Sequence, residues 1–108
     1  MTTVTFNLSE GKGGLQSSPE SASVTTAGAT LEFVLVGSAA TDYRITGYNS
    51  TDTANQLSSA TISADGITML VGDANTAAET MNIYVTVEHR KHSTKHQIDP
   101  QVINRPPN

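Results

Sequence analysis

The sequence of 108 residues contains no cysteine. It therefore offers no disulfide, no thiolate metal site and no cysteine nucleophile. The lack of disulfides mildly favours a cytoplasmic protein. No apolar stretch approaches the ~20 residues that a membrane-spanning helix needs. The first residues, Met1-Thr2-Thr3-Val4, show no basic segment followed by an apolar run, so we expect no signal peptide. Together these absences predict a soluble, cytoplasmic protein.

Charged residues are few, and their balance is mildly acidic. Ten acidic and six basic side chains give a formal net charge of −4, which does not indicate a surface for nucleic acid. Half of the basic side chains and all three histidines fall within residues 89–96. This segment contains no aromatic residue on which a base could stack, so we expect no binding to nucleic acid.

Leucine, lysine and glutamate are sparse, whereas serine and threonine are abundant, and this composition favours strands over helices. The central feature is the run Thr30–Val36, which lies between Gly28 and Gly37. A strand with one solvated face alternates between apolar and polar residues, but this run is apolar at nearly every position. We therefore predict a central strand that is covered on both faces.

Six further segments have the alternation or the flanking turn residues of half-buried strands. They are Thr3–Leu8, Ser21–Thr26, Tyr43–Tyr48, Ser59–Ser63, Ile67–Val71 and Met81–Glu88. Asp65-Gly66 predicts a hairpin, because glycine adopts the positive φ of such a turn. About seven strands without a helical period predict an all-β fold, an antiparallel two-sheet sandwich of immunoglobulin-like or cupredoxin-like type. A small closed β-barrel is the alternative, because it demands the same alternation.

The length fits a single domain over residues 1–108. Within it we expect residues 89–97 to form a mobile basic loop rich in histidine. Residues 98–104 carry branched apolar side chains, among them Val102 and Ile103, and such side chains are not typical of a disordered tail. We predict that this C-terminal segment docks on the sandwich as a short edge strand.

Three histidines, His89, His92 and His96, form the only set of metal-ligand residue types that resembles a catalytic zinc site. On a helix their spacing would place them on one face, but the segment follows a strand. Arg90 and Lys95 would also repel a dication. We interpret the segment as a solvated loop. We predict no catalytic, cofactor-binding or metal residues, and the three histidines remain the alternative metal ligands.

Two other motifs suggest ligands but lack the surrounding pattern. Gly11-Lys12-Gly13-Gly14 has neither the Gly-Lys-Ser/Thr ending nor the following helix of a phosphate loop. Asp73-Ala74-Asn75 with Glu79 suggests a calcium loop, but its spacing departs from an EF-hand and no helices flank it. We interpret the first as part of a flexible loop over residues 9–18 and the second as a polar turn.

Two stretches resemble known families. The sequence from Pro19 to Leu35 is similar to the early strands of cupredoxin-like domains, whose copper site needs a cysteine that is absent here. The C-terminal Ile98-Asp99-Pro100-Gln101-Val102-Ile103-Asn104-Arg105-Pro106 resembles the ending of the DP-EP family. That resemblance implies a short bacterial β-rich domain of a family without an established activity, and it brings no functional residue with it.

The sequence favours a non-enzymatic binding or structural module that acts through protein–protein contacts. Its partner would be another protein or a second copy of the chain, because pairing of edge strands in a dimer is one way to protect a sandwich. We identify no small molecule, membrane or cofactor as a ligand. The alternative is a metal-binding protein or metal-dependent enzyme that uses His89, His92 and His96.

Overall fold

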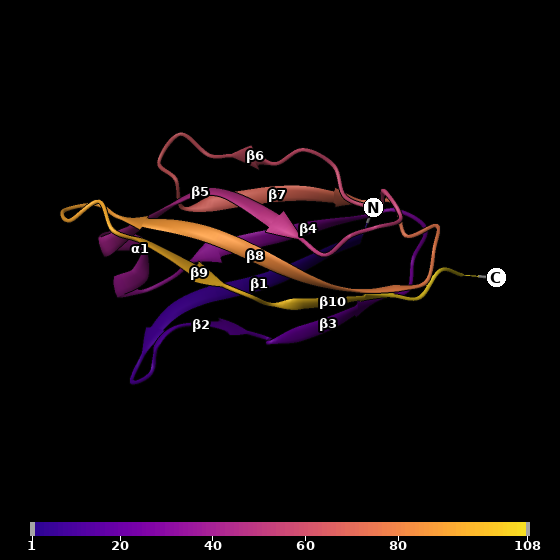
Figure 1. Cartoon of the computed structure of the whole chain (residues 1–108), viewed down its shortest axis with the longest axis horizontal. Helices are drawn as coiled ribbons and strands as arrows, with labels where there is room; N and C mark the ends of the chain where they lie inside the picture. Colours follow the sequence, from indigo (N-terminus) through magenta and orange to yellow (C-terminus); the bar gives the residue numbers. More distant parts are fainter. Residues whose placement is uncertain (1, 108) are drawn as a thin grey trace.

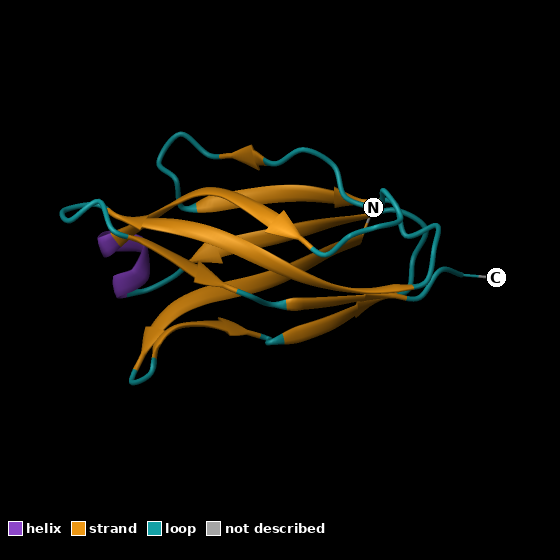
Figure 2. Ribbon diagram, in the orientation of Figure 1, coloured by secondary structure: helices purple, strands orange, loops and turns teal. Residues whose placement is uncertain are grey.

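The computed structural model describes residues 2–107, which form ten strands and one short helix (Figures 1 and 2). The first sheet contains β1 (Thr2–Gly11), β2 (Gly14–Ser18), β4 (Ala29–Leu35), β6 (Thr61–Ile62) and β7 (Thr68–Asp73). The second contains β3 (Ser21–Val24), β5 (Tyr43–Ser50), β8 (Glu79–His89), β9 (Lys95–Ile98) and β10 (Gln101–Asn104). The helix α1 covers Ser38–Asp42.

The first sheet has the strand order β2-β1-β4-β7-β6, and the second has the order β3-β10-β8-β5 with β9 also paired to β8. The all-β prediction is confirmed. The predicted antiparallel arrangement is wrong, because β1 runs parallel to β4 and β3 runs parallel to β10. Both sheets end in unpaired edge strands within residues 2–107, so the closed barrel is also wrong. No helix of these residues is long and apolar enough to span a membrane.

Strand β4 is the middle strand of the first sheet, as the sequence predicts, with β1 on one side and β7 on the other. Its inner face is buried at every position, but Val34 on the outer face is only half-buried. The predicted cover on both faces is therefore wrong. The fold has two layers, and on the outer face of this sheet Thr5 Oγ1 donates to Glu32 Oε1 at 2.9 Å in an exposed position.

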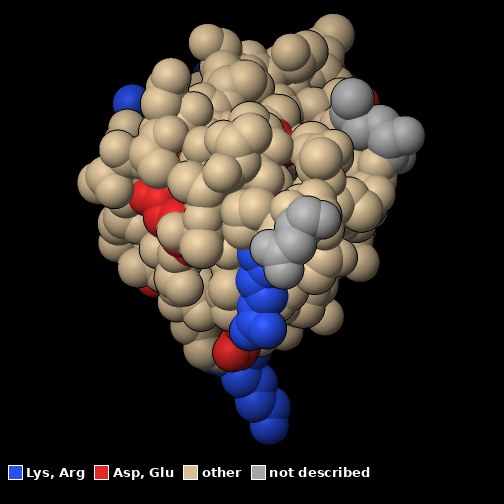
Figure 3. Space-filling view, turned by 90° about the vertical axis from the view of Figure 1, so that its right-hand side faces the viewer, with Lys and Arg blue, Asp and Glu red and all other residues tan. Residues whose placement is uncertain are grey.

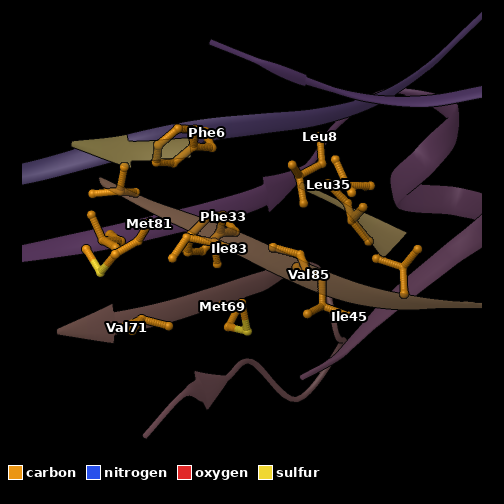
Figure 4. Close-up of a cluster of buried hydrophobic side chains, with 14 of the residues drawn as sticks. Phe6, Leu8, Phe33, Leu35, Ile45, Met69, Val71, Met81, Ile83 and Val85 are labelled. Carbon is orange, nitrogen blue, oxygen red and sulfur yellow. The ribbon is translucent and has the colours of Figure 1, made fainter. Parts of the chain in front are cut away.

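The core fills the space between the inner faces of the two sheets. Phe6 of β1 and Phe33 of β4 are register partners, and their rings stack with centroids 5.2 Å apart. Figure 4 shows the cluster that contains both rings together with Met81 and Ile83 of the opposite sheet. These four side chains are fully buried, and the alternation in β1 and β8 predicts this for Phe6, Met81 and Ile83.

Strands β9 and β10 follow the same edge of β8 in one continuous register. Pro100 lies between them, and its carbonyl oxygen accepts a hydrogen bond from Ile83 N at 2.9 Å. The turn after β8 is closed by His89 N, which donates to Thr94 O at 2.8 Å. The loop predicted over residues 89–97 is therefore too long, because its last three residues belong to β9.

Strand β10 lies between β3 and β8, so the edge strand that we predicted for residues 98–104 is an interior strand of its sheet. Gln101 N donates to Glu20 O at 2.8 Å at the start of the parallel pair with β3. Val102 is fully buried. Pairing on both sides explains why four residues near the end of the sequence hold a fixed position in the sheet.

Two segments outside the predicted strands form regular structure. Residues 14–18 form β2, and α1 occupies the polar connection after β4. After β2 the chain passes from the first sheet to the second at Ser18–Pro19, because β2 pairs with β1 whereas β3 pairs with β10. The side chains of β2 are mostly exposed, so this edge strand lacks the apolar alternation of strands such as β1 and β8.

Candidate functional site

One lateral side of the sandwich is closed by the β6–β7 hairpin. The hairpin predicted at Asp65-Gly66 is confirmed, and Gly66 has a φ of 75°. Gly66 O accepts a hydrogen bond from Ile45 N of β5 at 2.8 Å. The Arg90 guanidinium donates to Asp65 O at 2.7 Å. These bonds connect the hairpin of the first sheet to the edge of the second.

The Asp65 carboxylate organises this hairpin turn. Its Oδ1 accepts hydrogen bonds from the Ser63 hydroxyl at 2.6 Å and from Ile67 N at 3.0 Å. These two bonds, the Ser63 bond first, hold the pKa of Asp65 below its ordinary value, because they favour the ionised carboxylate. The turn is therefore arranged around a charged aspartate.

The opposite lateral side is open, and a cleft of ≈ 520 Å³ lies there between β2 and β9. The cleft lies where the chain passes from β2 in the first sheet to β3 in the second, because β2 stays beside β1 whereas β3 lies beside β10 (Figure 1). The cleft is lined mainly by polar side chains from both sheets, among them Gln16, Ser17, Glu20, Asn82, Gln97 and Asp99. Leu15 and Ile98 add apolar surface.

The backbone of β9 turns hydrogen-bonding groups towards this open side. His89 N donates to Thr94 O and Ile83 N donates to Pro100 O, so even-numbered residues of this strand face β8. The backbone groups of Lys95 and Gln97 therefore point away from β8. Within residues 2–107, β9 pairs with no strand other than β8, and β2 with none other than β1. Two strand edges are thus available at one cleft.

A smaller hollow of ≈ 330 Å³ extends the open side towards the turn after β8. It is lined by Gly13 and Gly14 of the β1–β2 turn and by Tyr43, His96 and Gln97. Gly13 and Gly14 belong to the motif interpreted as a flexible loop, and their motif meets no helix N-terminus here. Leu15 and Gln97 line both hollows, so the two hollows are adjacent.

Two of the three histidines of the predicted alternative metal site contact Tyr43, and the third, His92, contacts His89. Tyr43 contacts His89 and His96 edge to face, with ring centroids 5.0 and 5.6 Å apart, and the His89 and His92 rings are 4.5 Å apart. His89 Nδ1 accepts hydrogen bonds from the amides of Lys91 and His92. This nitrogen is occupied by the turn. Among residues 2–107, no three histidine, cysteine, aspartate or glutamate side chains are arranged to hold a metal ion.

Comparison with curated proteins finds no similar sequence. Among solved structures, an inclusion body protein from Burkholderia cenocepacia aligns at 11% identity and a TM-score of 0.46, covering 96% of this chain and 77% of its own. A cysteine protease inhibitor from Entamoeba histolytica aligns at 14% identity and a TM-score of 0.43, covering 95% of this chain and 97% of its own. The sequence itself matches one family over residues 1–106, as its C-terminal ending suggests. The chain belongs to the DP-EP family.

Proposed function

We propose that this chain is a non-enzymatic binding module that takes an extended segment of another protein into the cleft between β2 and β9. The observation that carries the proposal is the juxtaposition of two unpaired strand edges at one cleft of ≈ 520 Å³. An extended peptide can add to such an edge through main-chain hydrogen bonds, while alternate side chains enter neighbouring pockets.

The chemistry of the cleft supports this role. Gln16, Asn82 and Gln97 offer amide groups that both donate and accept hydrogen bonds, which suits a polar main chain. Leu15 and Ile98 give an apolar contact for a side chain of the incoming segment. The scaffold that presents the cleft is an immunoglobulin-like or cupredoxin-like sandwich in our proposal, since its chain switches sheets between β2 and β3.

The proposal is tested with peptides selected from a random phage-displayed library on the immobilised full chain. We expect the selected peptides to shift the backbone amide NMR signals of Lys95, Gln97 and residues 14–18. Gln97→Pro should abolish binding, because it removes an outward amide without removing a bond to β8. Ser59→Pro is the matched control, because Ser59 is exposed before β6 on the closed side, and binding should persist.

The proposal fails if the selected peptides shift the signals of β5 and β6 instead, or if no peptide binds. It also fails if the signals of residues 95–98 move only with protein concentration, because that result assigns the β9 edge to a second copy of the chain. The melting temperatures of both proline variants show whether a loss of binding reflects unfolding.

A further inference from the structure

A polar cluster occupies the inner space of the sandwich at the end opposite the turn after β8. Asp73 ends β7, Asn104 ends β10 and Glu79 begins β8, and Figure 1 shows these strand ends at the right-hand end of the molecule. Asn75 follows β7 in the connecting segment. Asp73 and Asn104 are each 2% exposed and Asn75 is 1% exposed, so three polar side chains lie where the core would continue.

Hydrogen bonds fix the orientation of these side chains. Asp73 Oδ1 accepts bonds from Asn104 Nδ2 at 2.8 Å and from Asn75 N at 3.0 Å. Asn75 Nδ2 donates to the carbonyl oxygens of Val24 and Thr26 at 3.0 and 2.9 Å. Carbonyl and carboxylate oxygens only accept, so each amide must present its nitrogen to them. The amide oxygens of Asn75 and Asn104 consequently face away from these partners.

The cluster lacks donors. Four buried side-chain atoms of residues 2–107 have no hydrogen-bond partner: Asp73 Oδ2, Asn75 Oδ1, Asn104 Oδ1 and Glu79 Oε2. All four are oxygens, and all four belong to this cluster. A buried acceptor without a partner is unfavourable, so four of them in one cluster favour a group that can satisfy them. A cation that takes several oxygen ligands would satisfy them together.

The surrounding charge has the sign that a cation needs. Glu79 is the register partner of Asn104, and its Oε1 accepts bonds from Thr53 N and Thr53 Oγ1, which leaves Oε2 unused. Burial, with the nearby charges of Asp52 and Glu79, raises the pKa of Asp73 above its ordinary value.

Asp52 adds a further carboxylate beside Glu79, and backbone amides of its own loop hold it in place. Its Oδ2 accepts the amides of Gln56 and Leu57 at 2.8 and 2.9 Å, and its Oδ1 accepts the amide of Ala54 at 3.0 Å. Figure 3, which faces this end of the molecule, shows a patch of acidic atoms on one side and basic atoms at the middle and below. This end of the sandwich carries charges of both signs, and the carboxylates that lie near Asp73 are those of Asp52 and Glu79.

We propose that this cluster binds Ca²⁺ through Asp73 Oδ2, Asn75 Oδ1, Asn104 Oδ1 and Glu79 Oε2. Calcium takes six to eight oxygen ligands in flexible geometry, including amide oxygens and waters, whereas magnesium demands a near-ideal octahedron. No three acidic, histidine or cysteine side chains of residues 2–107 are arranged for a metal, so the two amide oxygens are essential to the site. The site goes beyond the proposed peptide binding and does not depend on it.

The test measures the melting temperature and the heat of binding of the full chain, first in EDTA and then with CaCl₂. We expect Ca²⁺ to raise the melting temperature by about 5 °C or more at saturation, with a smaller effect of equimolar Mg²⁺. The side-chain amide NMR signals of Asn75 and Asn104 should shift during the same titration. This measurement on the unmodified chain needs no variant.

Asp73→Asn removes the charge but keeps an acceptor for the Asn104 and Asn75 donors, so the variant should fold and lose the response to Ca²⁺. Asp65→Asn makes the same change of charge at the exposed hairpin turn and should retain the full response. The proposal is overturned if the unmodified chain shows neither heat nor a melting shift at ~10 mM Ca²⁺, the weak end of protein calcium sites. It is also overturned if Asp73→Asn responds fully or if Asp65→Asn loses the response.

Discussion

Replacing Phe33 with alanine should destabilise the fold more than any change on the outer faces of the sheets. Phe33 is fully buried in the middle strand of the first sheet and stacks on Phe6 at 5.2 Å. Truncation of a buried phenylalanine costs about 3–5 kcal/mol, because apolar contact is lost and a cavity remains. Total stabilities of small domains are about 5–15 kcal/mol, so this loss would be a large part of the whole.

The pairing of the two rings adds a second measurable quantity. Offset stacking is worth about 0.5–1.5 kcal/mol beyond the buried area. In a double-mutant cycle, Phe6→Ala and Phe33→Ala together should therefore cost less than the sum of the single losses, by about 1 kcal/mol. Such a coupling would show that the parallel register of β1 and β4 places the rings in contact.

Urea denaturation monitored by circular dichroism measures these free energies of unfolding, provided that their slope against urea concentration is the same for all variants. Val34→Ala is the matched control on the same strand, because its side chain points to the half-exposed outer face. We expect it to cost less than about 1 kcal/mol. A loss below ~1 kcal/mol for Phe33→Ala, or equal losses at both positions, would refute the two-layer arrangement of this core.

Three further predictions concern the hairpin and the C-terminal strand. The hydrogen bond from Ser63 lowers the pKa of Asp65 in the folded state. Ionised Asp65 therefore stabilises the fold at a pH above the pKa that this residue has in the unfolded chain. This stabilisation is lost as the pH falls through the lower pKa of the folded state. Urea midpoints between about pH 2 and 6 should then fall more steeply for the unmodified chain than for Asp65→Asn. Gly66→Ala should cost about 1–3 kcal/mol in the same assay, because the residue has a φ of 75° and a Cβ would lie 2.7 Å from a side-chain atom of β5; an unchanged midpoint would contradict the turn geometry. In hydrogen exchange, the amide of Val102 should be protected far better than that of Ser93 in the exposed turn, and equal rates would show that β10 is not docked.

The inner and outer faces of the strands could be predicted from the sequence because side-chain direction alternates locally. Phe6, Leu8 and Met81 are buried where the alternation puts them. The same alternation carries no information on which strands are neighbours, so the parallel pairs escaped prediction. The edge strand β9 could not be predicted for another reason. Lys95, His96 and Gln97 are all exposed, so this strand shows no apolar face in the sequence.

The candidate sites depend on contacts between distant segments, which local patterns do not contain. The cleft joins Gln16 to Gln97, two ordinary glutamines in the sequence. The sequence predicts a polar turn for the Asp73-Ala74-Asn75 motif, because its spacing departs from an EF-hand and no helices flank it. Its burial depends on Asn104, which reaches it only after β10 has entered the sheet. The unpaired oxygens are therefore a property of the fold and not of the motif.

The position of β10 between β3 and β8 has a consequence for the order in which the chain can assemble during synthesis. Residues 21–24 are made early, but their partners in the sheet are residues 101–104, so β3 has no neighbour until 80 more residues have been added. At about 5–20 residues per second this interval lasts roughly 4–16 s. Contacts so distant in sequence also close slowly after release. The second sheet is consequently completed last, and a ribosome-bound chain stalled before residue 101 should expose β3 to proteases.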